Sequence, residues 1–411
     1  MKKFIFLIVP ALLLCDDLKS LLEFAKNSNN IINAKKISKS AKQKELDSSK
    51  STYYPTIDIG GFYQRYDEKN AFMSGTTYGA GATFGIDIYD GGKKYHTIKQ
   101  KKYEFSSSDY DFKDTQKSIS LAIVEDFYNI KSLKSLLQAR QEASKAVKAQ
   151  LQRMQRFYDV KMATSDDVDR LQSAYDKNIY AIESLKFQIL SLKKALELKV
   201  GKEIKSFDDS KFKKLEDDNG DELDKIKALK ASKNSILSRS ETIDSIYYPN
   251  IRVEDNYTFY GYEDKPSING MPIEQLDNQN KLMATLNLRV VDFGVIREKK
   301  EALNLHAKAL QEQILYKSKE QKMQQKLSKE RIKTSKLNIK SAKSALKAAN
   351  SAFKTITEKY NAGVVDNVVY LDALSSQTDS KATYEKSLND IEVAYAIYYY
   401  YNAKNLEEYL K

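Results

Sequence analysis

Residues 80–92, AGATFGIDIYDGG, and residues 282–294, LMATLNLRVVDFG, lie 202 positions apart and share one pattern. Apolar residues alternate along each stretch, which then ends in Asp90-Gly91-Gly92 or in Asp292-Phe293-Gly294. A Tyr-Tyr-Pro motif precedes each stretch, at 53–55 and at 247–249. Repetition on this scale predicts a chain built from two copies of one structural unit.

The first residues are typical of a secretory signal at 1–15. Lys2 and Lys3 precede an apolar run, Phe4–Leu14, that is too short to span a bilayer. Cys15, the only cysteine, is either the last residue before cleavage or a lipidated first residue of the mature chain. No later apolar run approaches the ~18–20 residues of a transmembrane helix, so the exported chain is either soluble or crosses a membrane with strands.

The composition excludes several functional classes. Without residues 1–15 the net charge falls from +12 to +10. The lysines are spread among acids and glutamines, which is typical of a solvated helical surface and, with export, argues against a nucleic-acid partner. Only two histidines occur, His96 and His306, and there is no phosphate-binding loop, zinc-protease motif or nucleophile elbow. We therefore expect no enzyme, no cofactor and no metal site.

Helix-breaking residues are absent from two long blocks. No proline lies in 93–248, and Gly363 is the only glycine in 295–411. With apolar residues at spacings of three and four, these blocks predict long helical hairpins at 93–200 and 295–402. The first arm of each hairpin is about 100 Å long at ~1.5 Å per residue, so it needs neighbouring helices for support.

The turns of both hairpins carry helix-end signals. Gly363 can take the left-handed conformation that ends a helix, and Asp366 can cap the next helix. In the first repeat either Thr164 or Ser165 can cap, with Asp167 in the following turn.

Alternating segments predict strands at about 53–66, 78–90, 248–262 and 281–292. With one apolar and one polar face they fit an outer-membrane barrel with a wet lumen, or alternatively the half-buried strands of a soluble sandwich. Tyrosines at the strand ends favour the membrane. A barrel needs about eight strands, so copies of the chain must pool their four, and three chains would supply twelve.

The expected fold is therefore mainly α-helical with a β-barrel portion. It comprises the signal at 1–15, a first repeat at 16–219 and a second repeat at 220–411. Each repeat contains a helix, two strands and a long helical hairpin.

The order of these elements and the hairpin turns resemble the TolC-like outer-membrane efflux and secretion channels. Lys359-Tyr360-Asn361-Ala362-Gly363, followed by Tyr370-Leu371-Asp372-Ala373, is similar to the family's tip pattern. The first copy, from Phe157-Tyr158 to Asp167-Val168, is a looser match, with Lys161 where the family often has glycine. The resemblance covers essentially the whole mature chain.

This resemblance implies a homotrimer in the cell outer membrane, with a twelve-stranded barrel and an α-helical tunnel across the periplasm. The trimer would be a passive duct for small toxic solutes or drugs, served by a periplasmic adaptor and an inner-membrane pump of RND or ABC type. Type I protein secretion is an alternative within the same architecture. A soluble periplasmic coiled-coil scaffold or adhesin stalk is the alternative from a different class.

The resemblance also assigns roles to residues of this chain. At the periplasmic gate, Tyr360 matches the gating tyrosine, Asp167 its carboxylate partner, and Asp372 one ring aspartate, beside Gly363. Val369 and Val365 stand where the family has a second ring aspartate and an arginine, which implies a weaker latch and a gate less blocked by cations. The barrel-to-tunnel junctions are expected at Asp90, Gly91 and Gly92 and at Asp292 and Gly294.

Overall fold

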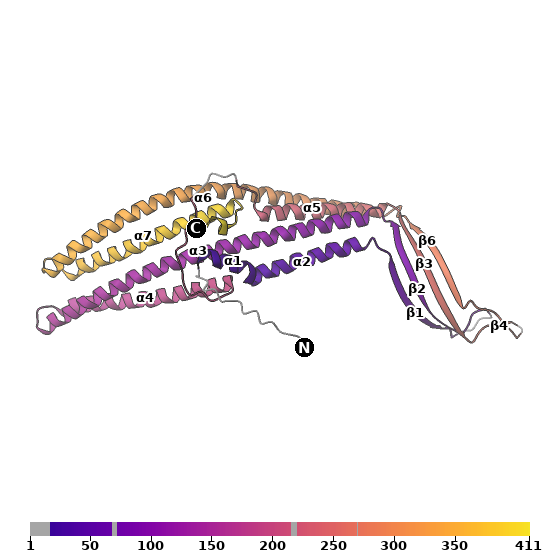
Figure 1. Ribbon diagram of the computed structural model, residues 1–411, viewed down its shortest axis with the longest axis horizontal. Coiled ribbons are helices and arrows are strands. Elements are labelled where there is room, and N and C mark those ends of the chain that lie inside the picture. Colours follow the sequence, from indigo (N-terminus) through magenta and orange to yellow (C-terminus); the bar gives the residue numbers. More distant parts are fainter. Residues whose placement is uncertain (1–16, 68–71, 215–219, 269) are drawn as a thin grey trace, which may run out of the picture. The chain divides into compact units, whose positions relative to one another are not determined.

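The computed structural model describes residues 17–67, 72–214, 220–268 and 270–411; the expected signal and Cys15 lie outside them. The chain passes twice through one order of elements, from helix to two sheet strands to a long helical hairpin (Figure 1). The first pass comprises α1 (Leu18–Ser28), α2 (Asn30–Ser51), β1 (Thr56–Arg65), β2 (Thr76–Tyr89), α3 (Lys93–Asp159) and α4 (Ser165–Val200). The second comprises α5 (Asp224–Asp244), η1 (Ser245–Tyr247), β3 (Asn250–Glu263), β4 (Ser267–Ile268), β5 (Met271–Pro272), β6 (Asn278–Asn287), α6 (Val295–Asn361), α7 (Asn367–Tyr401) and η2 (Leu406–Tyr409).

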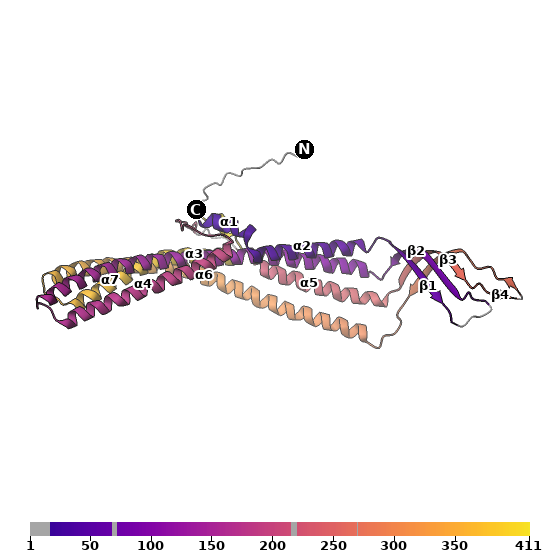
Figure 2. The ribbon, with the colours of Figure 1, turned by 90° about the horizontal axis from the view of Figure 1, so that it is seen from below.

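The chain divides into two compact units. One contains the described residues up to Lys36 together with Asp111–Lys225 and Lys317–Lys411, and the other contains Ile37–Tyr110 and Ile226–Tyr316. The first unit holds both hairpin turns, with α4 running along α3 and α7 along α6 in both views (Figures 1 and 2). The second unit holds the sheet. None of the described helices is apolar over a stretch long enough to cross a membrane.

The first unit has a continuous apolar core. Leu18 and Leu21 of α1 are fully buried with Phe127 and Tyr128 of α3 and Tyr398 of α7. Full burial of one such side chain contributes roughly 1.5–3 kcal/mol. The Tyr128 hydroxyl donates to a backbone carbonyl at 2.7 Å, and burial raises the pKa of that phenol far above its usual range. The core therefore joins helices from both repeats.

The second unit is organised by an antiparallel sheet in the order β1-β2-β3-β6. The register places Ile57, Phe84 and Leu282 in one row, and the rows on either side are also mainly apolar. The opposite face carries a polar network in which Arg252 donates to Asp87 at 3.0 Å and to Glu254 at 2.7 Å. The expected division into an apolar and a polar face is present.

Asp255 departs from this division in the middle of the sheet. Asp255 lies in the same row as Phe84 and Leu282, between Val253 and Tyr257 on its own strand. Its Oδ1 atom is buried, with no hydrogen-bond partner among the described residues. Asp255 therefore puts a carboxylate in the middle of the apolar face, at a position that the alternation along β3 assigns to that face.

The last sheet strand is shorter than expected. β6 ends at Asn287, whereas the sequence predicted a strand at 281–292 that includes Leu288 and Val290. Asn287 pairs with Asn250, the first residue of β3, so the hydrogen-bonded ladder has no partner strand beyond that point.

Candidate functional site

The junction between strand and helix is built alike in the two repeats. The Asp90 carboxylate accepts the backbone N–H of Gly92 at 3.0 Å and that of Lys94 at 2.8 Å. The Asp292 carboxylate accepts the N–H groups two and four residues beyond it, at 3.1 and 2.7 Å. Each aspartate thus satisfies N–H groups that the first turn of α3 or α6 leaves without a helical partner.

The backbone at each junction turns through two left-handed residues. The φ angles are 68° at Gly91 and 83° at Gly92, and 53° at Phe293 and 92° at Gly294. Left-handed geometry costs a residue other than glycine roughly 1–2 kcal/mol. The second junction is therefore the more strained of the two, because its first left-handed residue carries a side chain.

The hairpin turns, or tips, also repeat one geometry. The N–H of Lys161 donates to the Tyr158 carbonyl at 2.9 Å, and that of Gly363 donates to the Tyr360 carbonyl at 3.1 Å. In each tip the next N–H bonds the carbonyl five positions back, which completes a Schellman motif. The φ angles are 61° at Lys161 and 76° at Gly363. Lysine therefore occupies a left-handed position that glycine fills in the second repeat.

Each tip is closed by an N-cap on the following helix. Thr164 rather than Ser165 caps α4, because its hydroxyl accepts the N–H of Asp167 at 3.2 Å and donates to the Asp167 carboxylate at 2.8 Å. Asp366 caps α7 by accepting the N–H of Val369 at 3.0 Å.

Asp167 also joins the two tips. The side-chain amide of Asn367, the first residue of α7, donates to the backbone oxygen and to Oδ1 of Asp167, both at 3.2 Å. Asn367 is only 3% exposed. The other carboxylate oxygen of Asp167 is engaged by Thr164. One carboxylate thus orders the start of α4 and holds the start of α7.

A second polar link lies close by, where Arg153 Nη1 donates to Asn361 Oδ1 at 2.8 Å. Further links between α3 and α7 continue away from the tips: Arg140–Asp379 at 2.6 Å, Glu142–Lys381 at 2.6 Å and Ser132–Asn389 at 3.0 Å. Most of these side chains are exposed, and exposed ion pairs contribute about 0–1 kcal/mol each. The two hairpins are therefore held together by many weak polar contacts.

Tyr360 has a different environment from the one implied by the resemblance. No hydrogen bond joins it to Asp167 in the part of the chain that the structure describes. Its ring stacks on Tyr370 with centroids 4.8 Å apart, in an apolar cluster with Val147 and Leu171. Burial raises the pKa of the Tyr360 phenol. Within one chain, Tyr360 contributes apolar packing between the hairpins, and Asn367 supplies the polar link to Asp167.

The remaining predicted gate residues lie around this cluster. Val365 is half-buried against it, so this position contributes packing and no charge. Val369 is 41% exposed, and Asp372, one turn further along α7, is also exposed. The exposed side of the first turns of α7 therefore carries one carboxylate, Asp372, and an uncharged Val369. Elsewhere among the described residues, no three carboxylate, histidine or cysteine side chains are arranged to hold a metal ion.

Comparison with known proteins relates part of this chain to a family. Residues 21–201 match the family described as outer membrane efflux protein. The matched residues run from α1 to just past the end of α4, which is less than half of the chain. A comparison with curated protein sequences finds no significant match.

Solved structures share the fold of this chain at low sequence identity. The Campylobacter jejuni CmeC outer membrane channel is 13% identical with a TM-score of 0.84, over 95% of this chain and 86% of that one. A membrane protein from Pseudomonas aeruginosa is 13% identical with a TM-score of 0.82, over 94% and 93%. The open state of the Neisseria gonorrhoeae MtrE outer membrane channel is 12% identical with a TM-score of 0.77, over 95% and 89%.

Sequence reasoning missed Asn367, Arg153 and Asn361 as contacts between the hairpins. Only their closeness to a predicted turn could have indicated these three residues in the sequence, since each lies within about ten residues of one. Polar residues near helix ends are common, so this signal did not separate them from neighbours such as Asp166.

We expect Asp292→Ala to lower the melting temperature of the helical circular-dichroism signal in detergent, because two N–H groups lose their acceptor. The same bonds, first that from Ile296, hold the pKa of the Asp292 carboxyl below its usual range. Its stabilisation is therefore complete above the unfolded pKa of about 4 and is lost as the pH falls through the lower folded value. The difference from Asp292→Ala should shrink over that interval, and a constant difference would contradict the capping role.

Lys161→Gly should stabilise the first tip by up to about 1 kcal/mol, because glycine relieves the left-handed strain but has more freedom to lose on folding. Gly363→Ala should loosen the second tip. Hydrogen exchange of the tip amides measures both effects locally: exchange near residue 161 slows, and exchange near residue 363 accelerates. Faster exchange in Lys161→Gly would show that the lysine side chain stabilises its turn.

Proposed function

We propose that three copies of this chain form a passive outer-membrane duct of a tripartite export system for small toxic solutes or drugs. A periplasmic adaptor and an inner-membrane pump of RND or ABC type would deliver the substrate. The observation that carries this proposal is the direct connection of a two-faced sheet to two helices, α3 and α6, of 67 residues each. Such a connection suits a wall in a membrane that continues as a periplasmic tube.

The open edges of the sheet support a trimeric assembly. β1 and β6 are its outer strands, so each has one row of backbone groups that the sheet order leaves facing outward. Such edges are protected or paired in stable proteins, and a membrane tolerates them only in a closed barrel. Pairing β6 of one chain with β1 of the next closes the wall, and three chains give twelve strands.

The hairpin tips would form the gate of this duct. Asp167–Asn367 and Arg153–Asn361 hold the two tips of one chain together, and Tyr360 packs between them. Around a threefold axis, three copies of Asp372 would attract cations. Val369 adds no second ring of charge, so cations should block this gate less than a gate with two acidic rings.

Trimer formation and the two polar contacts between the tips can be tested on the purified protein. The purified protein should migrate as a trimer in mild detergent and form pores in planar bilayers; a monomer without conductance would contradict the assembly. Arg153→Ala combined with Asn367→Ala should raise the single-channel conductance at least twofold, because both links between the tips are removed.

Two matched variants complete this experiment. Asn350→Ala removes a hydrogen bond of the same kind, to Gln377 at 3.0 Å, but within one hairpin, and should leave the conductance unchanged. Tyr360→Phe should also leave it near the wild-type value, because its ring packing is kept. Unchanged conductance in the double variant would rule out that these two contacts keep the gate closed. An increase in Tyr360→Phe would mean that the Tyr360 hydroxyl bonds a neighbouring chain.

In the proposed trimer, the side chain of Asp255 faces lipid. A lysine or arginine on the lipid face of a barrel costs ~2–4 kcal/mol at mid-membrane, and an acidic residue costs less. Asp255→Leu should therefore stabilise the folded protein in lipid vesicles by about 1–2 kcal/mol, measured by urea unfolding. Glu254→Gln on the opposite face should give no such gain, because Glu254 accepts a bond from Arg252. A loss of stability in Asp255→Leu would show that this face does not meet lipid.

A further inference from the structure

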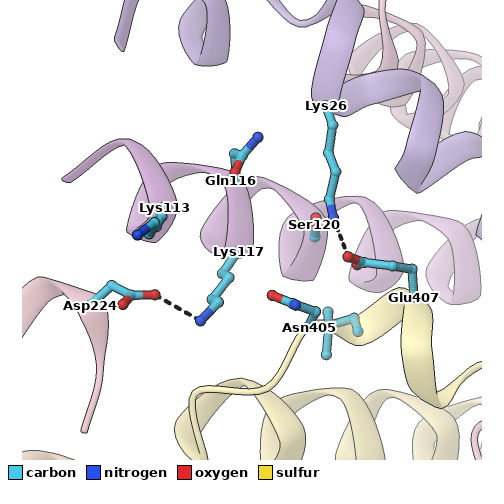
Figure 3. Close-up of a pocket in the computed structure, with 9 residues that line it drawn as sticks. Lys26, Lys113, Gln116, Lys117, Ser120, Asp224, Asn405 and Glu407 are labelled. Atoms are coloured by element: carbon cyan, nitrogen blue, oxygen red, sulfur yellow. Dashed lines mark hydrogen bonds and ion pairs between the residues drawn. The ribbon is translucent and has the colours of Figure 1, made fainter. Parts of the chain in front are cut away.

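Six exposed lysines recur at intervals of seven residues along α6. This lysine stripe consists of Lys319, Lys326, Lys333, Lys340, Lys347 and Lys354. Lys333 lies 3.7 Å from Glu330, and the other five are not paired with a carboxylate in the part of the chain that the structure describes. Lys117 shows the contrast, since it pairs with Asp224 at 2.7 Å in a polar cavity of the same unit (Figure 3).

The lysine stripe runs through a segment with a strong excess of positive charge. Residues 331–357 contain seven basic residues and no acidic one. Like charges three or four residues apart on a helix repel each other, as Lys340, Lys343 and Lys347 do here. Carboxylates from outside α6 would relieve this repulsion, so the stripe is suited to an acidic partner.

A matching acidic stripe lies on α4. Asp169, Asp176 and Glu183 are exposed and also recur at intervals of seven residues. Their printed neighbours are local, because Gln172 donates to Asp176 at 3.0 Å and Lys186 to Glu183 at 2.7 Å, all on α4. Exposed pairs within one helix are weak, so these carboxylates remain able to bind lysines of another helix.

The two helices also differ in side-chain size beside their stripes. Four residues after the acidic positions, Tyr180 and Phe187 of α4 are 77% and 71% exposed. Four residues after lysines of the stripe, α6 carries Ser344 and Ser351, with Ala348 between them, and all three are exposed. Exposed aromatic rings indicate a contact surface, and small residues on a facing helix leave room for such rings to pack.

The positions of α4 and α6 keep these surfaces apart within one chain. Beyond the tips, polar contacts between the hairpins join α3 to α7, so α4 and α6 are the outer helices of the pair (Figure 1). On both helices the charged stripe directly follows buried positions, as Glu183 follows Ile182 and Lys333 follows Ile332. Because α4 runs away from its tip and α6 toward its tip, the stripes of two neighbouring copies would lie on the same side of an antiparallel contact.

The spacing along the two helices agrees with such a contact. Counted from the tips, where α4 begins and α6 ends, Asp176 is level with Asn350, midway between Lys347 and Lys354. Glu183 falls in the same way into the next interval of the lysine stripe. Each of these carboxylates would therefore lie between two successive lysines of the other helix.

We propose that the lysine stripe of α6 binds the acidic stripe of α4 on a second copy of this chain, with Tyr180 and Phe187 packed against the small residues of α6. The proposal rests on the proposed trimer and adds which helix faces meet between its copies. A second copy is the partner because this chain itself carries the complementary charge, side-chain size and interval. Three such contacts close the helical part of the trimer, as the sheet edges close the barrel.

Disulfide cross-linking of the full chain in mild detergent tests this contact. Ser173→Cys combined with Ser351→Cys puts one cysteine on each helix at nearly the same level, so oxidation should give covalent trimers on a denaturing gel. Ser191→Cys combined with Ser351→Cys is the matched control, since Ser191 lies 18 residues, or about 27 Å, further along α4, and it should cross-link at least tenfold less. Ser351→Cys alone controls for the native Cys15 and should give no covalent trimer.

Charge reversal in the Ser173→Cys/Ser351→Cys protein tests the ionic pairing at low salt. Lys347→Glu combined with Lys354→Glu should slow cross-linking at least fivefold, because like charges then face each other. Adding Asp169→Lys and Asp176→Lys should restore the rate to within twofold, because opposite charges face each other again. This rescue separates a direct contact from damage to the fold.

Lys145→Glu combined with Lys148→Glu is the control for net charge and should leave the rate within twofold. Both lysines are exposed on α3, which has α4 on one side and α7 on the other. Equal slowing in this control, or no slowing in Lys347→Glu/Lys354→Glu, would overturn the ionic pairing, and the latter result would assign the stripe to another acidic partner. A trimeric, conducting wild type whose Ser173→Cys/Ser351→Cys variant forms no covalent trimer would overturn the helix contact and leave the duct standing.

Discussion

The carboxylates of Asp90 and Asp292 make the interaction on which the rest of the structure depends. Each accepts two backbone N–H groups at the point where the chain leaves a strand and begins a helix of 67 residues. These aspartates set where α3 and α6 begin, and the Schellman turns at Lys161 and Gly363 set where the two helices end. The tips are 202 residues apart, as are the two aspartates.

The repeat is preserved more strictly in backbone conformation than in sequence. The left-handed residues at Gly91, Gly92, Lys161 and Gly201 recur 202 positions later as Phe293, Gly294, Gly363 and Ala403. Glycine is thus replaced once at a junction and once at the C-terminal end of a hairpin, and lysine takes its place at one tip. The hydrogen bonds of each turn, rather than the identity of one residue, maintain the geometry.

The contacts between the hairpins are of two kinds. The apolar cluster around Tyr360 and Tyr370 supplies continuous packing, whereas the links around it are mostly exposed and individually weak. Asn367 is the exception, since it is buried and bonded twice to Asp167. A buried amide that loses its partner costs about 1–3 kcal/mol, so this single contact is a larger barrier to separation of the tips than any surface ion pair.

The sequence by itself determined the two repeats, the helical blocks, a cap at either Thr164 or Ser165, the cap at Asp366, and the two faces of the sheet, because these follow from local periodicity and turn chemistry. Only the tertiary structure decided that β6 stops at Asn287, since a strand ends where its partner ends. It also decided that Asn367 rather than Tyr360 bonds Asp167. Those outcomes depend on which distant segments pack together, and residue spacing along one segment carries no information about that.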